Sequence, residues 1–231
     1  GGCWCYFALS SSSSGRGKEA DGRASSRPPL AVEPGGEKYS LAVPSVLGAG
    51  REHSATSEFE VRDRSGGRLL GVLLAPPPPD GQPQDGSGAN YYEYVTLHSK
   101  SGREELAKCA LALSGDDSCK CHIFRGRSQL YGTLAPEVGG TGAGGDRRFV
   151  LVSPAGERLL ALRGRPPERK VEVLDQNGNV CAQTEPGVFD WARGGEFYAA
   201  ECRADADVGL VVLALLSLDR MTAHSRCASA G

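Results

Sequence analysis

A short pattern of apolar and polar positions occurs four times between residues 59 and 178. Each copy alternates apolar and variable positions, continues with Asp or Ser, and reaches Gly three residues later. Alternation with a period of two turns one face of a β-strand toward a core, and Asp or Ser followed by Gly favours a tight turn. We therefore expect four β-hairpins. Their key positions are Phe59, Val61, Asp63 and Gly66; Val95, Leu97, Ser99 and Gly102; Phe149, Leu151, Ser153 and Gly156; and Val171, Val173, Asp175 and Gly178.

An apolar run follows each of these turns, as expected for the returning strand of a hairpin. The four returning runs cover residues 69–74, 106–113, 159–162 and 180–182. Further short strands are predicted at residues 39–43, 122–124, 129–134 and 196–202. About twelve short strands separated by turns are typical of a barrel or a sandwich.

One segment near the end of the chain differs from this pattern. Residues 208–218, VGLVVLALLSL, contain no charge, so they have no solvent-facing side in any secondary structure. Asp205 and Asp207 before the segment are candidate N-caps of a helix, and Arg220 after it suits the negative end of one. A buried central strand is the alternative. We expect a helix enclosed by the strands, too short to cross a membrane unaided.

Gly and Pro divide the chain into a lead-in, a domain and a tail. The sequence contains 32 Gly and 14 Pro, which excludes an all-helical bundle. Residues 1–37 are predicted to be disordered, residues 38–221 to form the barrel domain, and residues 222–231 to be a disordered tail. The Pro-rich segment 75–89 and the Gly-rich segment 136–146 are predicted to be long loops between strands.

The hairpins and the terminal apolar segment together resemble a known family. The matching stretches are FEVRDRSGGRLL, KVEVLDQNGNV and EFYAAECRADADVGLVVLALLSLDRM. They are similar to the tubby C-terminal-like superfamily, which includes tubby proteins, phospholipid scramblases and the plant LURP-one-related proteins. The resemblance covers residues 38–221 and is closer to the LURP-one and scramblase side. It implies a closed barrel of about twelve strands around one hydrophobic C-terminal helix, in a domain that binds lipid.

The cysteines and the first residues bear on compartment and anchoring. Eight cysteines without a regular framework favour a reduced compartment, so we expect a cytoplasmic protein, with peripheral membrane association as an option. Gly1, Cys3 and Cys5 would suit dual lipidation if Gly1 followed a removed Met, although Cys5 stands where that motif has Ser or Thr. An arbitrary fragment end is the preferred interpretation of this terminus.

The remaining chemistry-bearing residues favour neither a metal site nor catalysis. Cys119, Cys121 and His122, with Cys109 nearby, supply only an irregular half of a zinc motif, and alternation sends the first two to one face. The Asp175 loop departs from the calcium-loop spacing. The four histidines have no nucleophile in a recognisable arrangement, and no nucleophile elbow is present. We expect a protein that is not an enzyme and has no cofactor and no metal.

Charge is unevenly distributed along the chain. The formal net charge is −2, which does not suit a nucleic-acid partner. Residues 147–170, however, carry seven basic and two acidic side chains. We therefore predict a basic face for anionic lipid headgroups, projecting into water around the Pro166–Pro167 connection. Its candidate residues are Arg147, Arg148, Arg163, Arg165, Arg169 and Lys170.

Three functions agree with these patterns. The first is a non-catalytic domain that binds anionic phospholipid or phosphoinositide membrane surfaces, as the resemblance implies. The second is a scramblase-like phospholipid transporter, and the third is a protein-interaction or structural module. Anionic membrane lipid and a protein are thus the two candidate partners.

Overall fold

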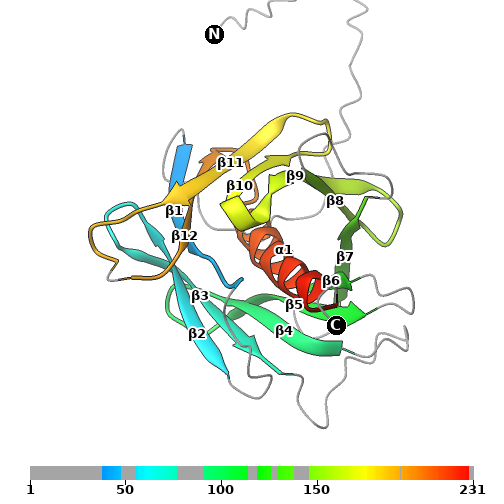
Figure 1. Cartoon of the computed structure of the whole chain (residues 1–231), viewed down its shortest axis with the longest axis horizontal. Helices are drawn as coiled ribbons and strands as arrows, with labels where there is room; N and C mark the ends of the chain where they lie inside the picture. Colours follow the sequence, from blue (N-terminus) through cyan, green and yellow to red (C-terminus); the bar gives the residue numbers. More distant parts are fainter. Residues whose placement is uncertain are drawn as a thin grey trace, which may run out of the picture.

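The computed structural model describes residues 38–47, 56–76, 91–113, 119–125, 129–137, 146–192 and 194–228. Twelve antiparallel strands form a closed barrel, and each strand pairs with its neighbours in the sequence (Figure 1). Strand β1 closes the barrel by pairing with β12 along seven residues and with β2 at two positions. The elements are β1 (Lys38–Pro44), β2 (Ser57–Asp63), β3 (Arg68–Ala75), β4 (Tyr91–His98), β5 (Glu105–Leu113), β6 (Cys119–Arg125), β7 (Gln129–Pro136), β8 (Arg147–Val152), β9 (Arg158–Arg165), the 3₁₀ turn η1 (Pro166–Glu168), β10 (Lys170–Leu174), β11 (Val180–Gly187), β12 (Phe197–Arg203) and α1 (Val208–Ala228).

The predicted fold is confirmed: a twelve-stranded closed barrel surrounds a single C-terminal helix. The segments predicted as loops at 75–89 and 136–146 fall between strands β3 and β4 and between β7 and β8, and most of their residues lie outside the described ranges. The segment predicted to be disordered, residues 1–37, also lies outside them.

The repeated Asp or Ser and Gly positions build the four hairpin turns. In each turn the Gly N–H donates to the carbonyl oxygen of the Asp or Ser three residues earlier, at 2.8–3.0 Å. The four glycines have φ between 72° and 88°, a conformation that costs Gly little. Asp175 shows the role of the side chain, because its Oδ1 accepts the N–H groups of Asn177 and Asn179 at 2.9 Å each. The turns thus follow directly from local sequence.

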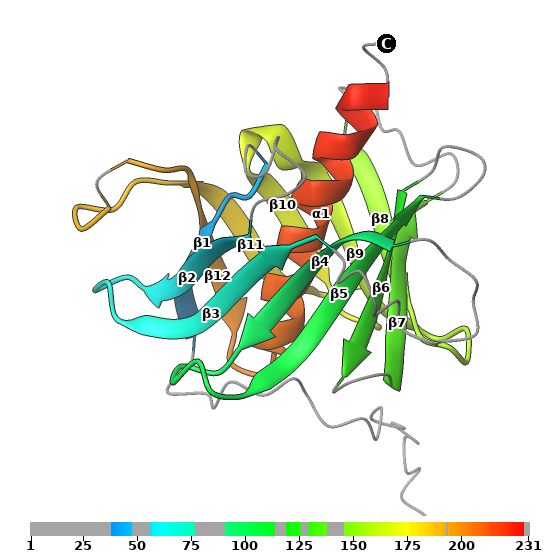
Figure 2. The ribbon, with the colours of Figure 1, turned by 90° about the horizontal axis from the view of Figure 1, so that it is seen from below.

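Helix α1 runs through the middle of the barrel (Figures 1 and 2). Asp207 is its N-cap, since its Oδ1 accepts the N–H of Leu210 at 3.0 Å. The side chains from Val208 to Thr222 are buried, and those of the inward positions of the strands surround them. Asp205 has another role and forms an ion pair with Arg203 at 2.6 Å.

The predicted end of this helix was wrong. The helix continues to Ala228, so the tail predicted to be disordered from residue 222 is helical for seven of its ten residues. Arg220 lies inside the helix rather than at its end, and it is 3% exposed. The helix continues past Leu218, where the apolar pattern stops. From Asp219 onward its side chains contact polar groups of the barrel instead of apolar ones.

These polar partners hold the second half of α1 in the barrel. The guanidinium of Arg220 donates from Nε and Nη2 to the two carboxylate oxygens of Glu93 on β4, at 2.7 and 2.9 Å, and from Nη1 to the carbonyl of Val46 at 2.9 Å. Asp219 accepts hydrogen bonds from the hydroxyls of Ser45 and Tyr198 and from the N–H of Val46. The helix is therefore fixed to β4, β12 and the residues after β1 by a buried polar layer.

Candidate functional site

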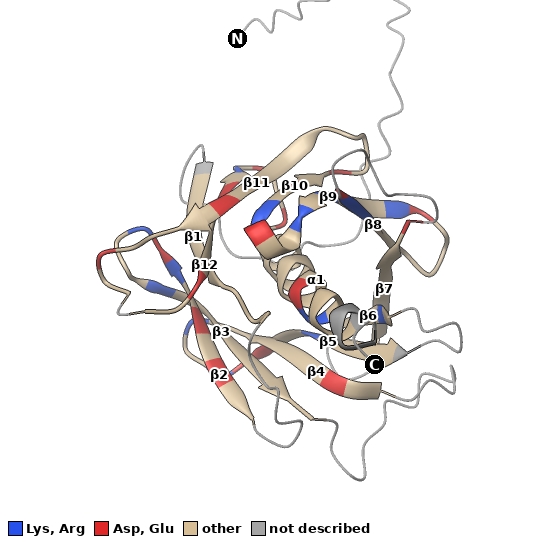
Figure 3. Cartoon of the chain, in the orientation of Figure 1, with Lys and Arg blue, Asp and Glu red and all other residues tan. Residues whose placement is uncertain are grey.

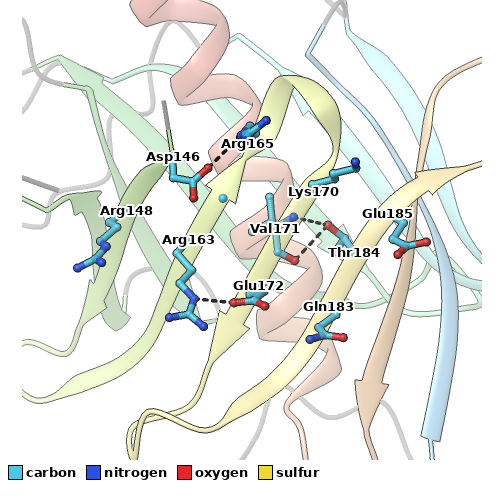
Figure 4. Close-up of a pocket in the computed structure, with 11 residues that line it drawn as sticks. Asp146, Arg148, Arg163, Arg165, Lys170, Val171, Glu172, Gln183, Thr184 and Glu185 are labelled. Atoms are coloured by element: carbon cyan, nitrogen blue, oxygen red, sulfur yellow. Dashed lines mark hydrogen bonds and ion pairs between the residues drawn. The ribbon is translucent and has the colours of Figure 1, made fainter. Parts of the chain in front are cut away.

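A groove lies on the outer face of strands β8 to β11 (Figure 4). Its volume is about 700 Å³. Basic side chains from three strands line it, together with three carboxylates. The lining residues are Asp146, Arg148, Arg163, Gly164, Arg165, Lys170, Val171, Glu172, Gln183, Thr184 and Glu185.

Strand register explains why these side chains share one face. Arg148 on β8 is opposite Arg163 on β9, Arg163 is opposite Glu172 on β10, and Glu172 is opposite Gln183 on β11. Residues that are directly opposite in an antiparallel pair point to the same side of the sheet. Arg165 and Lys170 form a second such pair in the same groove. Figure 3 shows the basic segments of β8, β9 and β10 side by side, with acidic segments next to them.

Gly164 shapes the floor of the groove. Its φ is 137°, and a Cβ at this position would lie 2.2 Å from the carbonyl oxygen of Lys170. Strand β10 therefore approaches β9 at this point more closely than any side chain would permit. On the other side of β10, the Thr184 hydroxyl accepts the N–H of Val171 and donates to the carbonyl of Arg169, both at 2.9 Å. A side chain thus replaces main-chain pairing between β10 and β11 there.

The structure brings four of the six predicted basic residues together and separates two. Arg148, Arg163, Arg165 and Lys170 line the groove. Arg147 is exposed on β8 but is not part of the lining. Arg169 adopts a left-handed conformation, with φ at 56°, and its side chain is 20% exposed and pairs with Glu196 at 2.6 Å.

The expectation that this basic group projects from a loop was wrong in part. Arg163 and Arg165 belong to β9 and Lys170 begins β10, so only η1 and Arg169 form the connection. Pro166 and Pro167 occupy the first positions of η1, where a missing N–H costs nothing. The strands can therefore continue up to the two prolines.

Carboxylates partly neutralise the groove. Arg163 pairs with Glu172 at 2.5 Å, and Arg165 pairs with Asp146 at 3.0 Å and with Glu168 at 3.2 Å. The two acidic neighbours raise the pKa of Arg165 above its ordinary value, so this guanidinium stays charged. Within the described ranges, no ion pair forms at Arg148 or Lys170, both of which are exposed. Among the four basic lining residues these two are without an ion pair to the described residues, and the carboxylate of Glu185 in the same lining is also without one, so the lining carries a net charge of +1.

Cys109, Cys119, Cys121 and His122, whose spacing does not match a zinc motif, are not assembled into one site. Cys109, Cys119 and Cys121 face the core, whereas His122 lies on the outer face beside Phe124. In the described part of the chain no three His, Cys, Asp or Glu side chains are placed to hold a metal ion. Burial raises the pKa of Cys119 to about 11, so its thiol is protonated at neutral pH and accordingly a poor nucleophile.

Sequence reasoning missed the acidic side of the groove and its floor. Asp146, Glu172 and Glu185 are scattered over 40 residues, and only the barrel register brings them to the basic side chains. The fold and the groove define a helix-filled antiparallel barrel with a polar, mixed-charge surface groove. No protein-family model matches the chain, and comparisons with curated proteins and with solved structures find no match. Among the described helices, none has the length and hydrophobicity needed to cross a membrane.

Proposed function

We propose that this chain is a non-catalytic barrel domain that binds anionic phospholipid or phosphoinositide headgroups at a membrane surface. The observation that carries the proposal is the pair of exposed cations Arg148 and Lys170, which form no ion pair with the described residues, in a groove that also holds Arg163 and Arg165. Exposed cations near an anionic surface each contribute about 1 kcal/mol of attraction. The resemblance of the strand and helix pattern to the tubby C-terminal-like superfamily supports the same proposal.

The ion pairs in the groove limit the expected affinity. Arg163 and Arg165 already contact carboxylates, so a headgroup must compete with Glu172, Asp146 and Glu168 for them. We therefore expect Arg148 and Lys170 to dominate, with a combined contribution of about 2 kcal/mol, or roughly a thirtyfold change in partition constant. Attraction of this kind weakens strongly between 0.1 and 1 M salt, as the Debye length falls from about 10 to about 3 Å.

Co-sedimentation with vesicles tests this proposal. The wild type should bind vesicles that contain phosphatidylserine or a phosphoinositide at 0.1 M salt and should not bind neutral phosphatidylcholine. The Arg148→Ala/Lys170→Ala variant should lose at least tenfold in binding. The matched control is Lys100→Ala/Arg103→Ala, which removes one Lys and one Arg from the exposed turn between β4 and β5 and should bind as the wild type does. Equal binding by the two variants, or binding unaffected by salt, would contradict the proposal.

The mixture of charges in the groove favours a second candidate function, the protein-interaction module. Arg148, Arg163 and Glu172 form a row of two cations and one carboxylate across three strands, which is complementary to a peptide or protein surface that carries both signs. If no vesicle composition binds, this second function becomes the preferred one. The scramblase-like alternative receives no comparable support, because α1, the apolar helix of the described residues, already fills the barrel.

A further inference from the structure

The connection between β11 and β12, residues 188–196, carries two aromatic side chains that pack on a third. Within it the rings of Phe189 and Trp191 stack with their centroids 5.2 Å apart. Phe197, the first residue of β12, contacts both rings edge-on, at centroid distances of 5.8 and 5.5 Å. Aromatic pairs in these two geometries are favourable beyond the area that they bury. The three rings, which we call the ring cluster, therefore fix the described part of the connection on the barrel.

Trp191 of the ring cluster contacts the turn between β2 and β3. Its indole N–H donates to the carbonyl oxygen of Arg64 at 3.3 Å, and the guanidinium of Arg62 lies over its ring, 5.5 Å from the centroid. Gly66 packs against the same ring, because a Cβ at this position would lie only 3.0 Å from Cγ of Trp191. Figure 1 shows the β11–β12 connection and the β2–β3 turn next to each other at one side of the barrel. One side chain thus joins two hairpins whose hydrogen-bonded residues are 127 positions apart in the sequence.

This contact crosses the closure between β1 and β2, which we call the seam. Ala199 on β12 is opposite Ala42 on β1, and Ala42 is opposite Arg62 on β2. Residues that are directly opposite in an antiparallel pair share one side of the sheet, and Leu41 beside Ala42 belongs to the core, so this row lies on the outer face. Trp191 therefore connects the β12 side of the wall to the β2 side along the outside.

The other described contacts across the outside of the seam are weak. Strands β1 and β2 pair at only two of the described positions. An ion pair joins Arg64 to Glu201 on β12 at 3.1 Å, but both side chains are exposed, and such pairs contribute little. Trp191 is half-buried and combines a hydrogen bond with a cation–π contact. Its ring therefore adds apolar contact where the main chain and the ion pair provide little.

We propose that the β11–β12 connection is a latch for the barrel wall. With Trp191 in place, the β2–β3 hairpin is held against β12 across β1; when the ring is released, the wall opens at the seam. The other side of the hairpin stays attached, because β3 pairs with β4 at five positions. Gly194 and Gly195, with φ at 88° and 91°, give the connection a point at which it can turn without side-chain strain. The latch is independent of lipid binding, since neither the ring cluster nor the β2–β3 turn lines the groove.

Amide hydrogen exchange of the full chain, measured residue by residue, tests the latch. Trp191→Ala should speed exchange of the β1 and β2 amides that face the seam at least tenfold, while the β8 and β9 amides exchange as in the wild type, because only local opening becomes easier. Trp191→Phe keeps an aromatic ring and loses the N–H, so its acceleration should stay below threefold. The matched control Val188→Ala truncates a side chain of the same connection that is 96% exposed, and it should change no rate by more than twofold.

A disulfide across the seam shows where the opening occurs. Ala42 and Arg62 are directly opposite each other, which places their Cα atoms within the span of about 4.4–6.8 Å that a disulfide bridges. In Ala42→Cys/Arg62→Cys/Trp191→Ala, oxidation by glutathione disulfide should return the seam amides to the wild-type exchange rate. Reduction by dithiothreitol should restore the fast exchange. Peptide mapping of the oxidised protein verifies that these two cysteines are paired.

Three results would overturn the proposal. The first is unchanged exchange at the seam in Trp191→Ala. The second is acceleration of the β8 and β9 amides by the same factor as the seam amides, because the ring would then stabilise the fold as a whole. The third is fast exchange that persists in the triple variant once the disulfide has formed, because the wall would then open elsewhere.

Discussion

Asp219 is a buried carboxylate on the central helix, and its ionisation works against folding. Burial raises the pKa of Asp219 from 3.8 to about 6, although Tyr198, Ser45 and the N–H of Val46 all donate hydrogen bonds to it. The charged form is thus less favourable in the folded protein than in water, and three donors offset only part of this cost. At neutral pH the side chain is a source of instability inside a well-packed core.

This raised pKa predicts a pH dependence of stability. The folded protein binds the proton of Asp219 more tightly than the unfolded chain, so the associated stability is present below pH 3.8 and is lost as pH rises through 6. The full loss is about 3 kcal/mol, of which about 1 kcal/mol falls between pH 5 and 7. Urea unfolding of the wild type and Asp219→Asn should therefore show a steeper decline for the wild type over that range. If the unfolding free energies of the two proteins changed equally with pH, the raised pKa of Asp219 would be contradicted.

At the scale of elements, the end of α1 depends on the ion pair between Arg220 and Glu93. Both side chains are almost fully buried, and two hydrogen bonds join them. Glu93 has a pKa below its ordinary value despite the opposing effect of burial, because His224 and Arg220 stabilise its charged form. Burying both charges carries a desolvation penalty, which their attraction offsets. Removing one partner leaves the other charge buried without compensation, and this destabilises the fold strongly.

Removing one partner should consequently destabilise the fold more than removing both. We expect Glu93→Met to lower the free energy of unfolding by about 3–5 kcal/mol, because it leaves the Arg220 charge buried without its carboxylate. The double variant Glu93→Met/Arg220→Met should recover a large part of this loss. Chemical unfolding of the three proteins gives the comparison, and a double variant less stable than Glu93→Met would contradict it. Arg158→Met, an exposed strand position, is a control that should change stability by less than about 0.5 kcal/mol.

The same ion pair shows where prediction from the sequence reaches its limit. Strands and turns are local: alternation and the Asp or Ser to Gly spacing lie within eight residues, so all twelve strands could be located. The end of α1 is non-local, because the partner of Arg220 stands 127 residues earlier. The groove could be predicted only in part from the sequence. Its basic residues are close in sequence, but register alone decides that Arg148 joins them and that Arg147 does not.

At the scale of the whole molecule, the closure of the barrel is uneven. Strand β1 pairs with β12 at seven positions but with β2 only at Leu41 with Asp63 and at Ala42 with Arg62. Among the described strand pairs this is the shortest ladder, so the seam between β1 and β2 is the place where the wall opens most easily.

Hydrogen exchange measured residue by residue should detect this seam. The amides of β1 that face β2 should exchange at least tenfold faster than those that face β12, since fewer ladder bonds must break to expose them. The β4–β5 pair, with seven paired positions, provides an internal reference for a long ladder. Uniform protection on both sides of β1 would show that the closure is even.

The position of α1 in the chain has a consequence for synthesis. All twelve strands precede the helix that fills them, so during translation their inward side chains emerge before the element that covers them. Until residue 208 and its successors leave the ribosome, a growing chain can form hairpins, but no complete wall can close on a dry interior. The barrel can therefore close around its core only after α1 has been synthesised. Many contacts of the fold also join residues far apart in the sequence, and such contacts make folding slow. The nascent protein therefore exposes apolar surface for a long time, and we expect chaperones to bind it during this time.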